Sequence, residues 1–325
     1  MTIDIEKTVP PFLKTLEEFR QLVDSADTFL FDCDGVLFLG TQLTENAKVL
    51  LDMLRSNGKK VIFVTNNSTK SRRQLKAHFD SLGLDASLEE CFGSAYASAV
   101  YLSEVLKFPK DKKVYVFGHE GIEEELDEVG IAHIGGSVST RLYIESPLTV
   151  TYFKDPEDRE FTPPIDYSQY SPDPSVGAVL CGADNWINWK KITKAVIYLH
   201  NPECRLVLTN PDATFPIGGS LFPAAGSMSA PIVYAAKQTP IVIGKPSKTM
   251  MDAVIAHHHI NPARTIMIGD NLHTDIEFGI NSGIRTLLVM GGVTKYEHIY
   301  GENPSPVVPT YVINRAGDLA ALAKQ

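Results

Sequence analysis

Short apolar runs that alternate with amphipathic segments constrain the fold of this chain more than any other feature. The runs are rich in Val and Ile and cover residues 29–31, 61–64, 114–117, 178–180, 206–208, 241–243, 265–268 and 286–289. Helical patterns lie between several of them, for example at 45–55, 71–82, 189–199 and 249–258. Continuous apolar strands that alternate with helices are typical of parallel sheets covered on both faces. The sequence therefore predicts an α/β fold.

Four of these runs end in polar residues that are suited to chemistry. Asp32 and Asp34 follow the first run, Thr65 opens a hydroxyl and amide cluster after the second, and Lys245 and Asp270 follow two later runs. In open α/β sheets, ligands bind outside the carboxyl ends of the strands. We therefore expect the four clusters to meet at one sheet edge.

The long segment between the second and third clusters indicates an inserted domain. It exceeds the length of a single crossover and has strand–helix alternation of its own. We predict an α/β insertion at residues 108–238 and a core made of residues 1–107 plus 239–325. Residues 146–176 have the composition of a long loop within the insertion.

Composition narrows the classes of partner and location. The chain has 325 residues and a formal net charge of −9, which argues against nucleic acid or an anionic membrane as the main partner. No apolar stretch reaches the roughly 18 to 20 residues of a membrane span, and the first residues do not resemble a secretory signal. The four cysteines form no C-x-x-C pair, so we expect reduced thiols in a cytoplasmic or nuclear protein.

The acids of the first and last clusters suit magnesium-assisted phosphoryl transfer. Asp32 can act as a nucleophile that forms an aspartyl-phosphate. Mg²⁺ prefers oxygen ligands, which the Asp32 and Asp270 carboxylates and the Asp34 carbonyl would supply. Asp34 can act as general acid and then as general base. Asp275, with Asn271 beside it, can hold a metal-bound water or orient the lysine from outside the ligand set.

The remaining polar residues suit phosphate binding. Gly35 allows a tight turn that presents N–H groups, and Thr65, Asn66 and Asn67 can hold phosphate oxygens. Lys245 supplies a compact positive charge for the phosphate and the nucleophile. Each piece alone also occurs in calcium loops, helix caps or solvated turns. The four pieces in this order, each after an apolar strand, favour the catalytic interpretation.

The stretches FLFDCDGVL, VIFVTNNSTKSR, VIGKPS and MIGDNLHTDI resemble, in order, the four motifs of the haloacid dehalogenase superfamily phosphatases. The insertion resembles the large C2-type cap of that superfamily. The segments SAYASAVYL, VFGHEGIEEEL, VGAVLCGAD and LTNPDATFP are similar to its 4-nitrophenylphosphatase and phosphoglycolate phosphatase group. This resemblance implies a Rossmann-like, HAD-like core and a cap that closes over the site. Asn271 departs from the arginine that many relatives have there.

The resemblance also implies a function and further site residues. It implies a Mg²⁺-dependent phosphomonoesterase for small phosphorylated metabolites, such as 2-phosphoglycolate, with 4-nitrophenyl phosphate as artificial substrate and a role in metabolite repair. Cap residues Phe215, Pro216 and Asp184 would then face the substrate, and a homodimer through the cap occurs in the family. Alternatives are a phosphoprotein phosphatase, a pyridoxal phosphatase, or a phosphotransferase with the same nucleophile.

Overall fold

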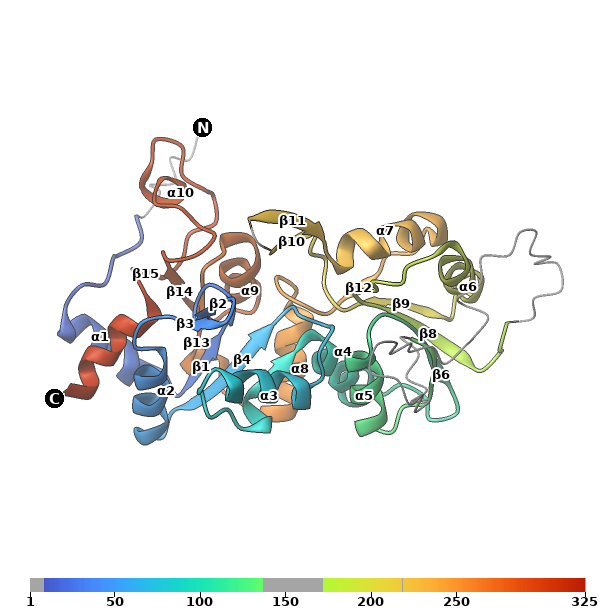
Figure 1. Ribbon diagram of the computed structural model, residues 1–325, viewed down its shortest axis with the longest axis horizontal. Coiled ribbons are helices and arrows are strands. Elements are labelled where there is room, and N and C mark those ends of the chain that lie inside the picture. Colours follow the sequence, from blue (N-terminus) through green and yellow to red (C-terminus); the bar gives the residue numbers. More distant parts are fainter. Residues whose placement is uncertain (1–8, 137–171, 218, 325) are drawn as a thin grey trace, which may run out of the picture.

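Two parallel sheets lie end to end along the long axis of the computed structural model, which describes residues 9–136, 172–217 and 219–324 (Figure 1). The first sheet has the strand order β15-β14-β13-β1-β4-β5, and the second has the order β12-β9-β8-β6-β7. All their pairings are parallel. The second sheet is inserted between β5 and β13 of the first, which confirms the predicted α/β core with an inserted α/β cap domain.

The strands have the following bounds. The core sheet consists of β1 (Thr28–Phe31), β4 (Lys60–Thr65), β5 (Cys91–Gly93), β13 (Thr265–Gly269), β14 (Arg285–Val289) and β15 (Tyr311–Ile313). The cap sheet consists of β6 (Lys113–Phe117), β7 (His133–Gly135), β8 (Val176–Cys181), β9 (Arg205–Leu208) and β12 (Ile241–Val242). Two antiparallel hairpins are formed by β2 (Phe38–Leu39) with β3 (Gln42–Leu43) and by β10 (Thr214–Ile217) with β11 (Ser220–Pro223).

The helices fill the connections between these strands. The α-helices are α1 (Leu16–Ser25), α2 (Ala47–Ser56), α3 (Arg72–Ser81), α4 (Ser94–Val100), α5 (Glu120–Glu128), α6 (Trp189–Leu199), α7 (Ala225–Ala236), α8 (Lys248–His258), α9 (Glu277–Asn281) and α10 (Glu297–Tyr300). The 3₁₀-helices are η1 (Leu88–Glu90), η5 (Pro262–Arg264) and η7 (Ala316–Lys324), and the π-helices are η2 (Tyr101–Val105) and η6 (Leu272–Ile276). Both α1 and α3 begin at a capping box, in which Thr15 and Ser71 accept a hydrogen bond from the first turn.

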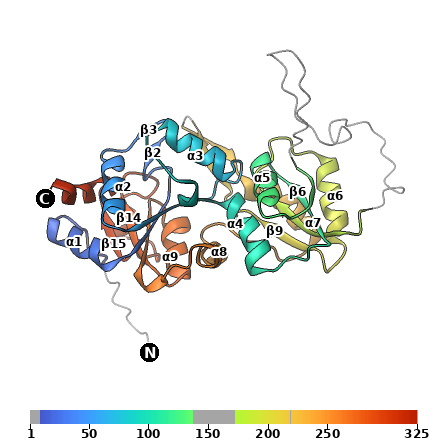
Figure 2. The same cartoon turned by 90° about the horizontal axis from the view of Figure 1, so that it is seen from below.

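Both faces of the core sheet are buried, as its continuous apolar strands predict. Successive side chains of a strand point to opposite faces. Phe29 and Phe31 accordingly belong to a cluster with residues of α1, α2 and α3, whereas Leu30 belongs to another with residues of α4 and α8. This second cluster continues through Val114 and Leu180 of the cap sheet. The two sheets therefore share one hydrophobic core across α4 and α8, which lie between them in Figure 2.

The order of the core strands creates a crevice at the carboxyl end of β1. From β1 the chain builds β4 and β5 on one side, and β13, β14 and β15 later build the other side. The strand order thus reverses between β1 and β13, and such a switch point is where open α/β sheets bind ligands. Asp32 follows β1 and Asp270 follows β13, so the fold places both acids at this crevice.

One strand lies in a different sheet from the one we expected. The run 241–243 falls in the predicted core segment 239–325, but β12 pairs with β9, with Ile241 opposite Val207 and Val242 opposite Leu208. The polar clusters therefore come from two sheets and not from a single edge. The other bounds of the two predicted segments stay a prediction, and most of the predicted loop 146–176 lies outside the described residues.

Two further expectations concern cysteines and membranes. All four cysteines are free and buried, in keeping with the reduced thiols expected from the sequence. Within residues 9–136, 172–217 and 219–324, every helix is too short or too polar to cross a membrane.

Candidate active site

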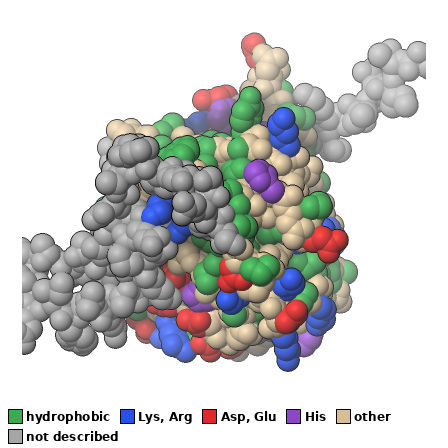
Figure 3. All heavy atoms as spheres, turned by 90° about the vertical axis from the view of Figure 1, so that its right-hand side faces the viewer, with side chains coloured by type: hydrophobic (Ala, Val, Ile, Leu, Met, Phe, Trp, Pro, Cys, Tyr) green, Lys and Arg blue, Asp and Glu red, His purple; other side chains and the backbone are tan. Residues whose placement is uncertain are grey.

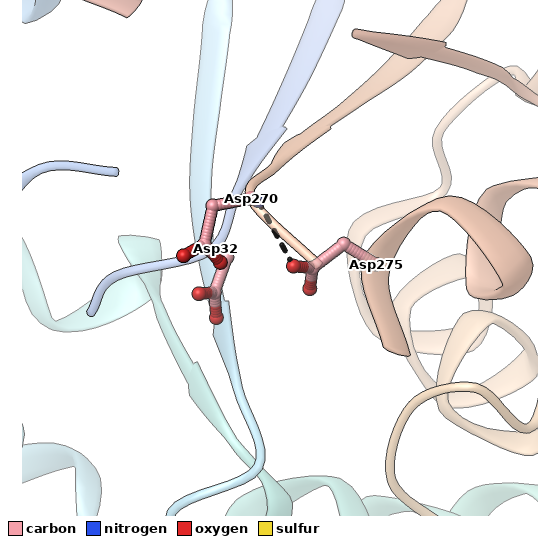
Figure 4. Close-up of side chains that lie close together, drawn as sticks. All are labelled: Asp32, Asp270 and Asp275. Atoms are coloured by element: carbon pink, nitrogen blue, oxygen red, sulfur yellow. Dashed lines mark hydrogen bonds between the residues drawn. The ribbon is translucent and has the colours of Figure 1, made fainter. Parts of the chain in front are cut away.

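Three aspartates form an acidic cluster at the switch point. Asp32, Asp270 and Asp275 each offer a carboxylate oxygen, and these oxygens lie within 4.8 Å of one another. Figure 4 shows Asp32 and Asp270 side by side at the ends of their strands, with Asp275 reaching in from η6. The backbone N–H groups of Asp270 and Asn271 donate to Asp275 Oδ2 over 3.2 and 3.1 Å. The turn after β13 thereby fixes the position of Asp275 relative to Asp270.

Lys245 places a positive charge in the cluster. Its ammonium donates to Asp32 Oδ1 over 2.6 Å, to Asp275 Oδ1 over 2.7 Å and to the Val64 carbonyl over 2.9 Å. These contacts use all three donors of a lysine. The residue is only 2% exposed. Lys245 is therefore held rigidly between the acid that follows β1 and the acid of η6.

The electrostatics of the cluster are strongly perturbed by burial. Burial raises the pKa of Asp270 to about 6, and the neighbouring Asp275 carboxylate acts in the same direction. Burial also raises the pKa of Asp32, against the opposing charge of Lys245. For Lys245, burial lowers the pKa, but the carboxylates of Asp275 and Asp32 outweigh it and raise the pKa overall. The lysine is therefore charged, and its ammonium is one cation for three carboxylates.

This imbalance fits a divalent metal ion. With every group ionised, the three carboxylates and the one ammonium sum to a charge of −2. The contacts with Lys245 and with the Val293 N–H engage one oxygen each of Asp32 and Asp270. Asp275, by contrast, has both oxygens engaged. Asp32 and Asp270 are thus the better metal ligands. Asp275 is suited to orient Lys245, which is one of the two roles that we predicted for it outside the set of metal ligands.

Asp34 lies in the loop between β1 and β2, next to Gly35, which packs against Asp270. The residue is exposed, but the surrounding protein partly desolvates its carboxyl and raises its pKa, against the opposing charges of His78 and Lys245. A raised pKa suits a group that must donate a proton near neutral pH. The raised pKa of Asp34 is therefore compatible with the predicted acid and base role.

Gly35 makes the close packing of this loop against Asp270 feasible. Its φ is +85°, and a Cβ at this position would lie 2.3 Å from Asp270 Oδ2. Its own N–H donates to the Phe38 carbonyl over 2.8 Å. In this structure Gly35 therefore provides the turn, and its predicted contact with phosphate stays a prediction.

The cluster after β4 has local and tertiary contacts. Thr65 is buried, and its Oγ1 accepts from the Asn67 N–H over 3.2 Å. The Asn67 side chain accepts from Thr69 within the same turn. Asn66 instead donates to Asp212 of the cap and to the Lys245 carbonyl. The structure thus brings Asn66 to the lysine, whereas the side chain of Asn67 belongs to a local turn.

The predicted cap residues show other contacts. Asp184 is 1% exposed and its Oδ2 accepts from Lys191 over 2.8 Å, within the cap. Its Oδ1 accepts from the Trp186 N–H. Phe215 lies in β10, is 40% exposed and packs against Phe222 of β11. Pro216 pairs with Leu221 in the same hairpin. The buried ion pair favours a structural role for Asp184, and substrate contact by the hairpin stays a prediction.

Sequence reasoning missed two contributions to the site. Asp212 follows the cap strand β9 and contacts Asn66 through a tertiary contact that no local pattern signals. Gly292 packs so closely that a Cβ would lie 1.7 Å from Asp270 Oδ2, and the next residue, Val293, donates its N–H to that oxygen. The Gly-Gly pair at 291–292 after β14 was the one available signal for this second contribution.

Comparisons with known proteins identify the family of this chain. The sequence matches a family model described as haloacid dehalogenase-like hydrolase over residues 29–132, and a HAD-hydrolase-like model over residues 242–319. It is 42% identical to a 4-nitrophenylphosphatase of Schizosaccharomyces pombe, over 96% of this chain and 99% of the relative. It is 40% identical to phosphoglycolate phosphatase 2 of Arabidopsis thaliana, over 96% and 98% of the two chains. The chain belongs to the haloacid dehalogenase-like hydrolases.

A solved structure supports the same conclusion for the fold. The p-nitrophenyl phosphatase of Archaeoglobus fulgidus superposes with a TM-score of 0.72 at 26% identity, over 91% of this chain and 98% of that one. The resemblance that the four motifs indicated is therefore confirmed. So is the expected enzyme class, a phosphoric monoester hydrolase.

Proposed function

We propose that this enzyme is a Mg²⁺-dependent phosphomonoesterase that hydrolyses small phosphorylated metabolites through an aspartyl-phosphate on Asp32. The observation that carries the proposal is the position of Lys245, with its ammonium 2.6 Å from Asp32 and 2.7 Å from Asp275 at the switch point. This arrangement holds the nucleophile beside a fixed positive charge, and phosphoryl transfer depends mostly on such positioning and charge stabilisation.

The residues divide the reaction into two displacements. An oxygen of Asp32 attacks phosphorus as the ester P–O bond breaks, and Asp34 gives its proton to the leaving oxygen. Asp34 then takes a proton from a water that attacks the aspartyl-phosphate, which releases inorganic phosphate and restores Asp32. Lys245 stabilises negative charge in both steps. Bound Mg²⁺, held by Asp32, Asp270 and the Asp34 carbonyl, would neutralise the repulsion between carboxylate and phosphate.

The cap and the relatives support a proposal for the substrate class. A cap domain that packs against the core shields the crevice from large substrates. The relatives named above act on 4-nitrophenyl phosphate or phosphoglycolate by their names. We propose 2-phosphoglycolate and similar short phosphorylated acids as substrates, with a role in metabolite repair in the cytoplasm. Pyridoxal phosphate, phosphoproteins and transfer to another acceptor remain the competing proposals.

The test combines one variant with one substrate panel. We expect Asp32→Asn to abolish phosphate release from 4-nitrophenyl phosphate while its circular dichroism spectrum stays that of the wild type. EDTA should stop the wild-type reaction, and Mg²⁺ should restore it. Substantial turnover by the folded variant would contradict the assignment of the nucleophile. Values of kcat/KM over a panel of phosphometabolites and phosphopeptides, with ¹⁸O-labelled water, would separate the competing substrates and acceptors.

We also propose that the protein forms a homodimer through the cap. The support is the exposure of large apolar side chains in the cap domain, including Tyr234 at 87% and Leu221 at 71%. Figure 3 shows the end of the molecule formed by this domain, where hydrophobic side chains lie among acidic and basic ones. Sedimentation analysis of the wild type and of Tyr234→Asp tests this proposal, which predicts a shift towards monomer in the variant.

A further inference from the structure

Asn66 is one of the points where polar contacts join the two sheets of the molecule. Its side-chain amide donates to Asp212 Oδ1 and Oδ2 over 3.2 and 3.0 Å, and to the Lys245 carbonyl over 2.9 Å. Its backbone carbonyl accepts from the Asn210 side chain over 2.7 Å. Asn66 follows β4 of the core, whereas its partners follow β9 and β12 of the cap sheet. The carboxyl ends of three strands from two sheets therefore meet at one residue.

The orientation of the Asn66 amide is fixed by these acceptors. Three oxygens face its NH₂ group, so the flipped amide would place an oxygen against oxygens. Its own Oδ1 is buried and accepts no hydrogen bond from the described residues. A Cβ on Gly244 would lie 2.6 Å from this oxygen, so no larger residue fits there without a shift. The side chain is thus held by its donor side alone, through Asp212 and the Lys245 carbonyl.

Hydrogen bonds within the cap hold the loop that carries Asp212 in place for this contact. The Asp212 N–H donates to Asn210 Oδ1 over 3.1 Å, and the Gly226 N–H donates to the Asp212 carbonyl over 2.9 Å. The neighbouring strand ends are joined as well, because the Gly244 N–H donates to the Thr209 carbonyl over 2.8 Å. Asp212 and the lysine loop therefore follow adjacent strands of the cap sheet, and both bind the same amide.

We propose that Asp212 is a positioning residue for the catalytic lysine. Its carboxylate holds the Asn66 amide, and this amide holds the backbone of Lys245, so that the ammonium meets Asp32 and Asp275. Asp212 acts through Asn66 and needs no contact with the reacting phosphate. This inference rests on the proposed phosphatase function for its catalytic consequence, but not for the contact itself.

A double-mutant cycle tests whether Asp212 acts through Asn66. Loss of a hydrogen bond to a charged acceptor corresponds to about a 10- to 100-fold effect, so we expect Asp212→Ala to lower kcat/KM for 4-nitrophenyl phosphate by that factor. The loss should fall mainly on kcat, because the lysine acts on the transition state. Asp212→Asn keeps one acceptor for the Asn66 amide but replaces the other oxygen by an NH₂ donor, so its loss should be smaller than that of Asp212→Ala. Glu203 is an exposed carboxylate of the cap, so Glu203→Ala is the matched control.

The decisive comparison uses Asn66→Ala. In that background Asp212→Ala should change kcat/KM by less than about twofold, because its only route of action is already gone. Additive effects of the two substitutions would overturn the proposal. An Asp212→Asn variant as impaired as Asp212→Ala would also overturn it, because the acceptor that asparagine retains would then contribute nothing.

A second readout separates this inference from the proposed function. Hydrogen exchange without substrate should be faster in Asp212→Ala at residues 66–68 of the core as well as at residues 209–212 of the cap. Unchanged exchange at 66–68 would refute the contact's role in holding Asn66. A wild-type protein that cleaves no phosphate ester would refute the proposed function, and the exchange result would then decide the inference by itself.

Discussion

Replacing Asp270 by Asn should stabilise the metal-free protein while it disables the enzyme. The carboxylate of Asp270 is 4% exposed and lies beside two other acids. Burial, followed by the charge of Asp275, raises its pKa from an ordinary value of 3.8 to about 6. The folded protein therefore holds a proton on Asp270 more tightly than the unfolded chain does. Stability that is present below about pH 4 is lost as the pH rises towards 6.

The size of this loss follows from the same pKa. The difference between 3.8 and about 6 amounts to about 3 kcal/mol above pH 7, at about 1.36 kcal/mol per pKa unit. At pH 4.5 the same linkage gives only about 1 kcal/mol. The raised pKa of Asp270 already includes the opposing effect of the hydrogen bond from the Val293 N–H. Asparagine has nearly the same shape and no charge, so Asp270→Asn should recover about 3 kcal/mol at pH 7.5 and about 1 kcal/mol at pH 4.5.

Urea unfolding in EDTA at both pH values measures this difference. Asp80→Asn is the control, because Asp80 is a surface carboxylate paired with Lys76, and its loss should change stability by less than about 1 kcal/mol. Saturating Mg²⁺ should stabilise the wild type and have much less effect on Asp270→Asn, since only the wild type keeps the full ligand set. A variant that is less stable than the wild type in EDTA at pH 7.5 would show that burial of this carboxylate is not costly, and the electrostatic argument for a metal would fail.

Three further substitutions test the surroundings of the site. Lys245→Met should lower kcat/KM by about 100- to 1000-fold and cost the metal-free protein about 3 to 5 kcal/mol in urea unfolding, because it leaves buried carboxylates without their cation; a variant with near wild-type kcat/KM would contradict the role of the lysine. Gly292→Ala, whose Cβ would lie 1.7 Å from Asp270 Oδ2, should raise the Mg²⁺ concentration for half-maximal activity by about tenfold or more, and an unchanged Mg²⁺ titration would contradict it. Glu125→Ala breaks the ion pair between Glu125 and Arg72, whose side chains are 3% and 9% exposed. It should lower the free energy of unfolding in urea by about 3 kcal/mol, and a loss below about 1 kcal/mol would show that the pair contributes little.

The central elements of this fold were predictable because their signals are local. The run 29–31 lies in β1, the helical pattern 189–199 coincides with α6, and the helical pattern 71–82 contains α3. Each is a segment in which burial on one or both faces dictates the residue types. The acids after β1 and β13 were predictable for a related reason, since parallel strands place their carboxyl ends at the same edge. Asp32 and Asp270 accordingly meet in the structure, whereas Lys245 reaches Asp32 from the cap sheet.

The sheet that holds β12 could not be predicted in this way. A half-buried two-residue strand carries the same apolar signal in either sheet, and its partner is chosen by tertiary packing against β9. The contact of Asp212 with Asn66 has the same character, because it joins residues 146 positions apart in the sequence. The ion pair of Asp184 with Lys191 was hidden for another reason, since a loop acid before a helix is as compatible with substrate binding as with a structural contact.

The position of β12 also limits how substrate can enter the crevice. Lys245 follows a strand of the cap sheet, and the Gly244 N–H extends the pairing with the Thr209 carbonyl almost to the lysine itself. A rotation of the whole cap sheet away from the core would therefore pull the ammonium away from Asp32 and expose the hydrophobic cluster shared through Leu30 and Leu180. Burial of that cluster opposes such a rotation. The β10–β11 hairpin lies above the sheets in Figure 1, and its residues Phe215 and Phe222 are 40% and 44% exposed. We therefore expect substrate access to depend on smaller movements, such as those of this hairpin.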